Sequence, residues 1–384
     1  MNDSTLSAGR WMAEVFLGTK DLEAIRKRFS QLSEPVLVVT GDASYESSGA
    51  QELITEFLRD KRHERFAVTA QLPGPEAISD WVGVISGGRP GSVVAVGGGR
   101  VIDCAKLIAL SSTNDDFLEL SDFRGAQPAA PIVAVPTTAG SGSERTPFAV
   151  SYRDGIKYSI EHPSLLPVLA VVIPDLTESM SKPVTAAAGL DALAHSIESC
   201  WAVRSTAESR SVSMSALSEI WSVIRQTVRE PSPQVRETMA FAASNAGHAI
   251  ATARTTAAHA LSYSLTSEYG VPHGVAVAVT LGPLFRKNSE VSADNCQDPR
   301  GAGHVRSIVR DIGEILGHSN PHHAAEEFEN LLAEFPVPSS LSAMGIRSGT
   351  DRMRLARSVN PERLGNNPRV LGFEDLASIL EMAD

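Results

Sequence analysis

The stretch Val93-Val-Ala-Val-Gly-Gly-Gly-Arg-Val-Ile-Asp-Cys-Ala-Lys106 is the most informative segment for the fold. Its β-branched run, three glycines and helical spacing predict a strand, a tight turn and a helix. Because Gly97, Gly98 and Gly99 carry no side chains, a ligand can approach the backbone closely. The N–H groups that begin the helix attract anions, and a diphosphate is the natural occupant. The spacing is not G-x-G-x-x-G, so a purely structural turn is the alternative.

Further short apolar runs lie on both sides of this segment. Gly41 follows the run Val36–Thr40. A proline follows each of the runs Ile132–Val135 and Val168–Ile173. Together with Ser92–Val96 they are typical of buried parallel strands separated by helices. The first half therefore predicts an α/β domain, a parallel sheet with helices on both faces.

The second half is rich in alanine and has helical spacing throughout. The segments expected to be helical are Ala186–Trp201, Ala207–Thr227, Arg236–Leu265, Ala324–Glu334 and Phe373–Met382. An α/β half followed by a helical half indicates two domains. We place them at residues 1–180 and 181–384, with the boundary in the Thr177–Pro183 loop and an all-α C-terminal domain.

Composition excludes several classes of function. The chain has 384 residues, of which 42% are hydrophobic, and a formal net charge of -11. An acidic chain repels phosphate backbones, so we expect no nucleic-acid partner. No run of about 20 apolar residues predicts a membrane span, and Met1–Trp11 lacks an apolar signal core. Cys104, Cys200 and Cys296 are isolated, which favours reduced thiols. We expect a cytoplasmic protein that forms a homo-oligomer.

A second polar loop follows another expected strand. Pro136-Thr-Thr-Ala-Gly-Ser-Gly-Ser-Glu144 has two glycines and four hydroxyl side chains. Hydroxyls and backbone amides suit ribose and phosphate oxygens. Two such loops at the carboxyl ends of parallel strands favour a nucleotide crevice, whereas an ordinary polar loop is the alternative.

One carboxylate and three imidazoles form a candidate metal site. Asp191 and His195 are four residues apart, so they share one helical face. His259 is expected in a helix, and His273 in a loop after Pro272. Such a donor set suits a divalent transition metal and leaves a coordination position for a substrate oxygen. Taken alone, this spacing is also compatible with surface hydrogen bonds and ordinary core histidines.

Four motifs in this order resemble the iron-activated (group III) alcohol dehydrogenase family. They are the glycine loop with Asp103, the Pro136-Thr-Thr-Ala-Gly140 loop, Gly189-Leu-Asp-Ala-Leu-Ala-His195 and Pro272-His-Gly274. The resemblance covers nearly the whole chain. It implies a dinucleotide-binding N-terminal domain and a helical domain that binds metal and substrate.

The resemblance also implies roles for individual residues. The metal ligands would be Asp191, His195, His259 and His273, with iron(II) or zinc(II) as the ion. The NAD(P)H contacts would be Gly97, Gly98, Gly99 and Asp103 at the diphosphate, Thr137 and Thr138 at the nucleotide, and Lys157 at its phosphates or ribose. The reaction would be hydride transfer between the nicotinamide and a small aldehyde or alcohol, with the metal stabilising the developing alkoxide.

Three positions depart from the family pattern. Arg100 replaces a serine that follows the glycines, and Gly74 replaces an asparagine. Tyr263 replaces a histidine that is linked to proton relay in the family, so Tyr263 is our candidate catalytic proton donor, with water as the alternative.

A narrower resemblance concerns the phosphonoacetaldehyde reductase branch. It is carried by Gly41–Ala50, Asp154–Ser159, Ile197–Trp201 and Thr255–Tyr263. It implies reduction of phosphonoacetaldehyde to 2-hydroxyethylphosphonate. A phosphonate needs cations and donors, for which the candidates are Arg254 and the hydroxyl groups of Thr256 and Tyr263. The alternatives are a reductase of another small aldehyde, a lyase or cyclase similar to dehydroquinate synthase, and a non-catalytic nucleotide-binding scaffold.

The choice between NADH and NADPH depends on the end of the second strand. A carboxylate there bonds the ribose hydroxyls of NAD and repels the extra phosphate of NADP. Gly41 and Asp42 are the two candidates for this position. If Gly41 occupies it, NADPH is admitted, and if Asp42 does, NADH is preferred; we favour NADPH slightly.

Overall fold

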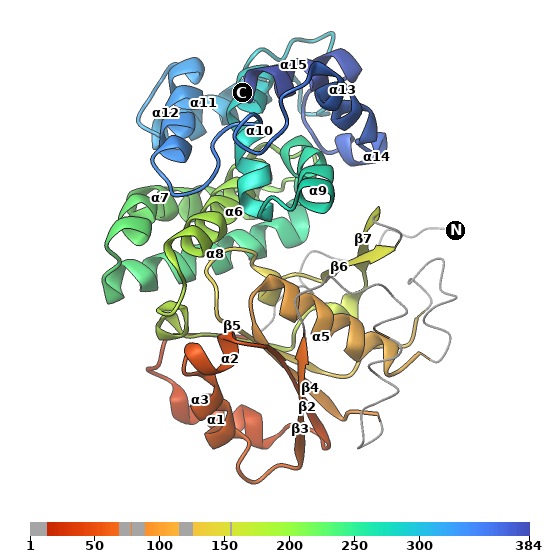
Figure 1. The fold of residues 1–384 in the computed structure, drawn as a ribbon, viewed down its shortest axis with the longest axis vertical. Coiled ribbons are helices and arrows are strands. Elements are labelled where there is room, and N and C mark those ends of the chain that lie inside the picture. Colours follow the sequence, from red (N-terminus) through yellow and green to blue (C-terminus); the bar gives the residue numbers. More distant parts are fainter. Residues whose placement is uncertain (1–13, 69–77, 79–88, 115–125, 154–155) are drawn as a thin grey trace. The chain divides into compact units, whose positions relative to one another are not determined.

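The computed structural model describes residues 14–68, 78, 89–114, 126–153 and 156–384, with the backbone alone at 152–153 and 156–158. Two compact units divide the chain, Met1–Ser179 and Met180–Asp384. Each unit is drawn in Figure 1 and is described separately below.

The first unit is built on a parallel sheet of six strands in the order β1-β8-β5-β4-β2-β3. The strands are β1 (Glu14–Leu17), β2 (Val36–Gly41), β3 (His63–Val68), β4 (Ser92–Gly97), β5 (Ile132–Pro136) and β8 (Leu169–Val172). Every pairing among them is parallel. The four strands that the apolar runs predict are therefore confirmed, and they occupy the centre of the sheet.

Helices cover both faces of this sheet because its central strands are apolar on both sides. Leu37 and Val39 of β2 pack in one hydrophobic cluster with helix α5 (Gly99–Ser111). The alternate residues of β2 pack in a second cluster with helices α1 (Leu22–Ser30) and α3 (Ala50–Phe57). The short helix α2 (Ser44–Ser47) follows β2. This arrangement confirms the expected α/β fold class.

Four strands have no counterpart among the apolar runs. The edge strand β3 alternates between exposed and partly buried residues, and β1 has partly or fully exposed residues throughout. Strands β6 (Phe148–Arg153) and β7 (Ile156–Glu161) form a separate antiparallel hairpin. An edge strand needs no continuous apolar run because one of its sides faces solvent.

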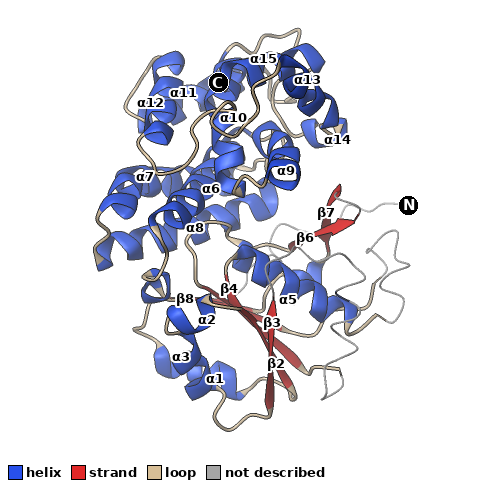
Figure 2. Ribbon diagram, viewed as in Figure 1, coloured by secondary structure: helices blue, strands red, loops and turns tan. Residues whose placement is uncertain are grey.

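The second unit is helical, as expected. Its helices are α6 (Lys182–Trp201), α7 (Ala207–Arg229), α8 (Pro233–Ala253), α9 (Ala257–Tyr269), α10 (His273–Ser289), α11 (Ala302–Ile315), α12 (Pro321–Ala333), α13 (Gly349–Ser358), α14 (Pro361–Leu364) and α15 (Phe373–Met382). Figure 2 shows this change from a mixed unit to a helical one. An isolated bridge joins Cys296 and Arg369.

Two local predictions in this unit are wrong. The expected helix Arg236–Leu265 is two helices, because Arg254 adopts φ 65° and ψ 173°, which no helix accommodates. The Nδ2 atom of Asn366 donates to the carbonyl oxygens of Ala253 and Thr255 at 2.8 and 2.9 Å and so holds the break. His273 is the first residue of α10 rather than part of a loop, since the helix begins directly after Pro272.

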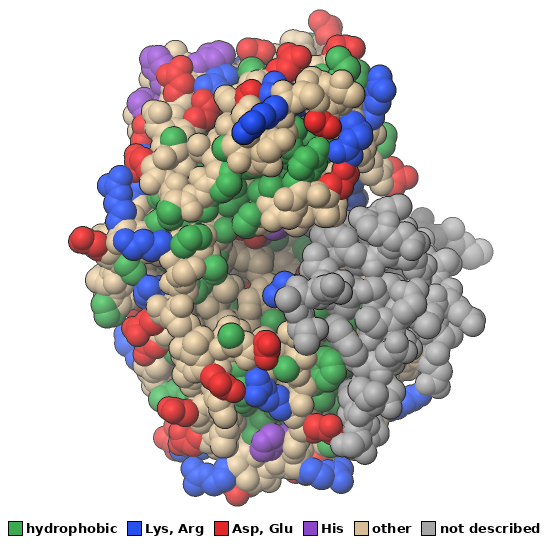
Figure 3. All heavy atoms as spheres, in the orientation of Figure 1, with side chains coloured by type: hydrophobic (Ala, Val, Ile, Leu, Met, Phe, Trp, Pro, Cys, Tyr) green, Lys and Arg blue, Asp and Glu red, His purple; other side chains and the backbone are tan. Residues whose placement is uncertain are grey.

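On the face drawn in Figure 3, acidic and basic side chains are interspersed over the described residues. Within the described parts of the chain, no helix combines the length and apolar character needed to cross a bilayer.

Candidate functional site

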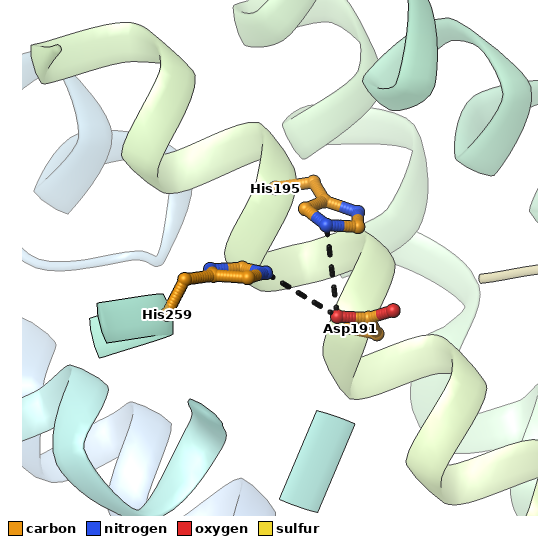
Figure 4. Close-up of side chains that lie close together, drawn as sticks. All are labelled: Asp191, His195 and His259. Atoms are coloured by element: carbon orange, nitrogen blue, oxygen red, sulfur yellow. Dashed lines mark ion pairs between the residues drawn. The ribbon is translucent and has the colours of Figure 1, made fainter. Parts of the chain in front are cut away.

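Three helices of the second unit bring the four candidate ligands together. Asp191 and His195 lie one turn apart on α6, while His259 lies on α9 and His273 begins α10. The Nε2 atoms of His195, His259 and His273 lie 3.7, 3.5 and 3.9 Å from Oδ1 of Asp191. Figure 4 shows the Asp191 carboxylate facing the rings of His195 and His259.

These distances suit a common metal ion. The donor atoms of Asp191, His195 and His259 all lie within 4.8 Å of one another. Ligands bound at about 2.1 Å to one tetrahedral ion are about 3.4 Å apart. The side chains of these three residues are at most 10% exposed, whereas that of His273 is 34% exposed. The cluster is therefore buried except at His273.

Two buried polar atoms of the cluster lack a hydrogen-bond partner among the described residues. Among the described residues, Oδ1 of Asp191 and Nε2 of His259 find no hydrogen-bond partner. Buried polar atoms in proteins are nearly always hydrogen-bonded, so each such exception calls for an explanation. A cation between the two atoms would satisfy both once it displaces the ring proton of His259, and the residues present therefore fit a divalent metal.

The charges of the cluster also favour a bound metal cation. Burial raises the pKa of Asp191, but the neighbouring His195, His259 and His273 outweigh it and hold that pKa well below its usual range. Burial lowers the pKa of His259, yet the carboxylates of Glu198 and Asp191 raise it to about 9. A metal ligand must be a neutral imidazole, so a bound cation would take the place of this proton.

Glu198 is a buried carboxylate next to the cluster, and it is not one of the four predicted ligands. It lies three residues after His195 on α6, and that helical spacing was the available signal. Its Oε2 contacts Nδ1 of His259, and its Oε1 accepts hydrogen bonds from Thr256. Glu198 is completely buried.

The three expected substrate contacts lie in different environments. Thr256 is only 2% exposed, and its hydroxyl bonds Glu198 and Trp201, so it is already used within the protein. Arg254 is half-buried in the connection between α8 and α9. Tyr263 lies one turn after His259 on α9. Burial raises the pKa of Tyr263, Arg363 lowers it, and Glu198 raises it further.

The glycine turn of the first unit is held closely by its surroundings. Gly97 ends β4, Gly98 is the N-cap of α5, and Gly99 is the first residue of that helix. A Cβ on Gly97 would lie 2.7 Å from Cβ of Val101, and one on Gly99 would lie 2.4 Å from Oγ of Ser141. Packing alone thus requires glycine at both positions, whether or not a ligand binds.

The start of α5 nevertheless suits an anion. Its N-cap residue Gly98 has no side chain, so no side-chain cap occupies the start of α5, where backbone N–H groups attract anions. Thr138 lies against this turn, 3.3 Å from the position of a Cβ on Gly98. Thr137 is buried, and its backbone N–H donates to the carbonyl of Gly97 at 3.1 Å.

Asp103 has a role within the protein. Its carboxylate accepts hydrogen bonds from Oγ of Ser143 at 2.6 Å and from the backbone N–H of Val150 at 3.1 Å. The completely buried Lys106 donates to Ser143, Thr146 and Phe148. Helix α5 therefore holds the second polar loop directly, through Asp103 and Lys106.

The remaining expected nucleotide residues are placed as follows. Gly41 ends β2, and Asp42 follows with an exposed side chain. Lys157 lies on β7, where only its backbone is described, paired with Tyr152. Gly74 lies outside the described residues.

Comparison with known proteins identifies two family models in this chain. Residues 13–174 match the model described as iron-containing alcohol dehydrogenase, and residues 185–383 match the C-terminal model of the Fe-containing alcohol dehydrogenase family. A phosphonoacetaldehyde reductase of Streptomyces viridochromogenes is 35% identical over 305 residues, which cover 76% of each chain.

Solved structures of oxidoreductases also superpose on this chain. A sulfoacetaldehyde reductase from Bifidobacterium kashiwanohense in complex with NAD+ superposes with a TM-score of 0.83 at 26% identity, covering 96% of each chain. A 1,3-propanediol oxidoreductase superposes with a TM-score of 0.84 at 27% identity, covering 97% of this chain and 98% of the other.

Proposed function

The chain belongs to the iron-containing alcohol dehydrogenase family, and from this premise we propose that it reduces phosphonoacetaldehyde to 2-hydroxyethylphosphonate. Members of the family are oxidoreductases that interconvert small aldehydes and alcohols with NAD(P) and a divalent metal. The observation that supports a metal-dependent reaction is that two potential metal-ligand atoms, Oδ1 of Asp191 and Nε2 of His259, are buried without a hydrogen-bond partner among the described residues.

We assign the metal to Asp191, His195, His259 and His273. One carboxylate and three neutral imidazoles leave a divalent ion with a net positive charge. When bound, iron(II) or zinc(II) supplies Lewis-acid polarisation of the substrate carbonyl. The partly exposed side of the cluster, at His273, is where a substrate oxygen would enter.

We assign the dinucleotide to residues 1–180, and the metal and substrate to residues 181–384. The uncapped start of α5 at Gly98 and Gly99 would hold the diphosphate through backbone N–H groups. Thr138 would contribute its hydroxyl beside that turn. The role of Asp103 and Lys106 in this scheme is to hold the second loop in place.

Reduction adds a hydride to the carbonyl carbon and a proton to its oxygen. We assign the proton to the hydroxyl of Tyr263, which lies one helical turn from His259. Burial raises the pKa of Tyr263, so its hydroxyl stays protonated at neutral pH and is available as a donor.

The phosphonate group is assigned to Arg254. A guanidinium holds tetrahedral oxyanions with a fork of donors. Arg254 lies five residues before His259, in the connection that leads into the helix of that ligand. Among the described residues it is the one non-glycine residue with a positive φ. Such backbone strain is concentrated at functional sites, where surrounding structure maintains it.

A panel of aldehydes tests this proposal. The metal-loaded enzyme is assayed with NADH and NADPH on phosphonoacetaldehyde, sulfoacetaldehyde and uncharged propionaldehyde. We expect kcat/KM to be highest for phosphonoacetaldehyde. A preference for sulfoacetaldehyde would transfer the proposal to that substrate, in line with the sulfoacetaldehyde reductase neighbour. Equal activity on all three would reject an anionic substrate, and conversion without net oxidation of the nucleotide would indicate a lyase or cyclase.

A further inference from the structure

We propose that Glu198 is a positioning residue that sets the orientation and the tautomer of His259 for metal binding. Thr256 and Trp201 in turn hold Glu198 in place. This inference rests on the metal-binding role proposed above, and it concerns a residue outside the four ligands.

The contact between Glu198 and His259 determines which ring nitrogen carries the hydrogen. Oε2 of Glu198 contacts Nδ1 of His259, and both side chains are buried. An ionised carboxylate can only accept a hydrogen bond, so Nδ1 is the donor. The lone pair of Nε2 is then directed to the side where Oδ1 of Asp191 lies 3.5 Å away.

The second oxygen of Glu198 places the helix on which His259 lies. Oε1 accepts hydrogen bonds from the backbone N–H groups of Thr256 at 3.0 Å and Ala258 at 3.1 Å. These residues are the N-cap and the second residue of α9, and His259 is the third. The side chain of Thr256 does not cap this helix, so a carboxylate from α6 does so in its place. Negative charge at a helix N-terminus is also electrostatically favourable.

Thr256 and Trp201 complete the chain of hydrogen bonds. The hydroxyl of Thr256 donates to Oε1 of Glu198 at 2.6 Å and accepts from Nε1 of Trp201 at 3.0 Å. This assignment is unambiguous because the indole can only donate. The ring of Trp201 lies 5.7 Å from that of Phe285 on α10. The network therefore connects α6, α9 and α10, the three helices that carry the candidate ligands.

The charge balance of the interior supports the same role. Asp191 and Glu198 are two buried carboxylates, 7% and 0% exposed. A divalent cation beside neutral imidazoles would bring the net charge of this group to zero, whereas two buried carboxylates without compensation are costly.

The test uses Glu198→Gln and a matched pair at Thr256. In Glu198→Gln the carbonyl can still accept from α9, but the amide NH2 then faces Nδ1 of His259 and moves the ring hydrogen to Nε2. Thr256→Val removes the hydroxyl with little change in shape, while Thr256→Ser keeps it. Asp298→Asn alters a buried carboxylate elsewhere, one that is paired with Arg300, and is the control.

Three measurements are made on the full chain: zinc affinity by chelator competition, the visible spectrum with cobalt(II), and the unfolding midpoint of the metal-free protein. We expect Glu198→Gln to weaken zinc binding by about 10- to 100-fold and to change the cobalt spectrum. Thr256→Val should weaken binding by a smaller factor, while Thr256→Ser and Asp298→Asn keep the wild-type affinity.

Wild-type zinc affinity in Glu198→Gln would overturn the inference, even with a lower unfolding midpoint, because Glu198 would then be only structural. If Glu198→Gln does not fold, the Thr256 pair decides, and equal affinity in the valine and serine variants overturns the inference. A wild-type chain that binds neither zinc nor cobalt would reject the metal-binding role itself.

Discussion

Nε2 of His259 lies 3.5 Å from Oδ1 of Asp191, although neither atom makes a hydrogen bond within the described chain. Leaving a buried polar atom unsatisfied costs about 1–3 kcal/mol. The two residues come from different helices, α6 and α9, so a ligand between them links two elements of the second unit. A metal at this position should therefore affect stability as well as activity.

Metal loading should stabilise the folded chain. A ligand that binds only the folded state at 100 times its Kd adds about 2.7 kcal/mol to the free energy of unfolding. Thermal unfolding of chelator-treated protein, followed by circular dichroism, should show a midpoint that rises with added zinc. A midpoint that does not respond to zinc, iron(II) or cobalt(II) would contradict a metal site in the folded protein.

Removing single ligands should separate the buried and exposed sides of the site. We expect His259→Ala and His273→Ala to lose most of their bound metal and turnover while remaining folded, with the larger loss of metal at the more buried His259. His322→Ala, at an exposed histidine on α12, is the control. Metal analysis after dialysis is compared with turnover, and normal turnover in either variant would show that the ligand set is wrong.

Substitutions at Arg254 should separate strain from substrate binding. Glycine accepts the φ of 65° that Arg254 adopts, so Arg254→Gly should stabilise the fold by roughly 1 kcal/mol. Arg254→Ala keeps the strain and loses the guanidinium. Both variants should lower kcat/KM for phosphonoacetaldehyde far more than for propionaldehyde. Equal losses on the two aldehydes would contradict the assignment of the phosphonate to Arg254.

The buried lysine of the first unit predicts a pH dependence. Burial lowers the pKa of Lys106 from 10.5 to about 8, although Asp103 and Glu144 oppose the shift. Between pH 8 and pH 10.5, Lys106 holds its proton in the unfolded chain but not in the folded chain. The contribution of Lys106 to the free energy of unfolding therefore rises with pH. A shift of this size corresponds to on the order of 3 kcal/mol.

Lys106→Met tests this effect. The variant leaves the carbonyl oxygens of Ser143, Thr146 and Phe148 without their donor, so it should be less stable at every pH. In denaturant unfolding, the difference in free energy between wild type and variant should grow from pH 7 to pH 10. A difference that is constant or shrinks with pH would show that Lys106 does not lose its proton in this range.

The nucleotide preference depends on the end of β2. Gly41 is the last residue of this strand and Asp42 follows it. If Gly41 is the decisive position, the ribose phosphate of NADPH is admitted and Asp42→Ala leaves the ratio of kcat/KM for NADPH and NADH unchanged. A large swing toward NADPH in this variant would instead identify Asp42 as the residue that selects NADH.

Several features of the fold were accessible from the sequence because they are local. Runs such as Val36–Gly41 and Ser92–Gly97 are buried on both faces, so they must be continuously apolar and are recognisable. The edge strand β3 was missed because its exposed positions interrupt that pattern. Asp191 and His195 were recognisable as a pair because four residues of helix bring their side chains to one face.

Other features were decided only by tertiary structure. The alanine-rich stretch around Arg254 favours helix, yet contacts from Asn366 hold it in a break. Likewise, no local pattern shows that Glu198 meets His259, or that the hydroxyl of Thr256 is used within the protein. These contacts join segments far apart in the chain. Their geometry depends on how helices pack, and side-chain spacing within one helix carries no information about its neighbour.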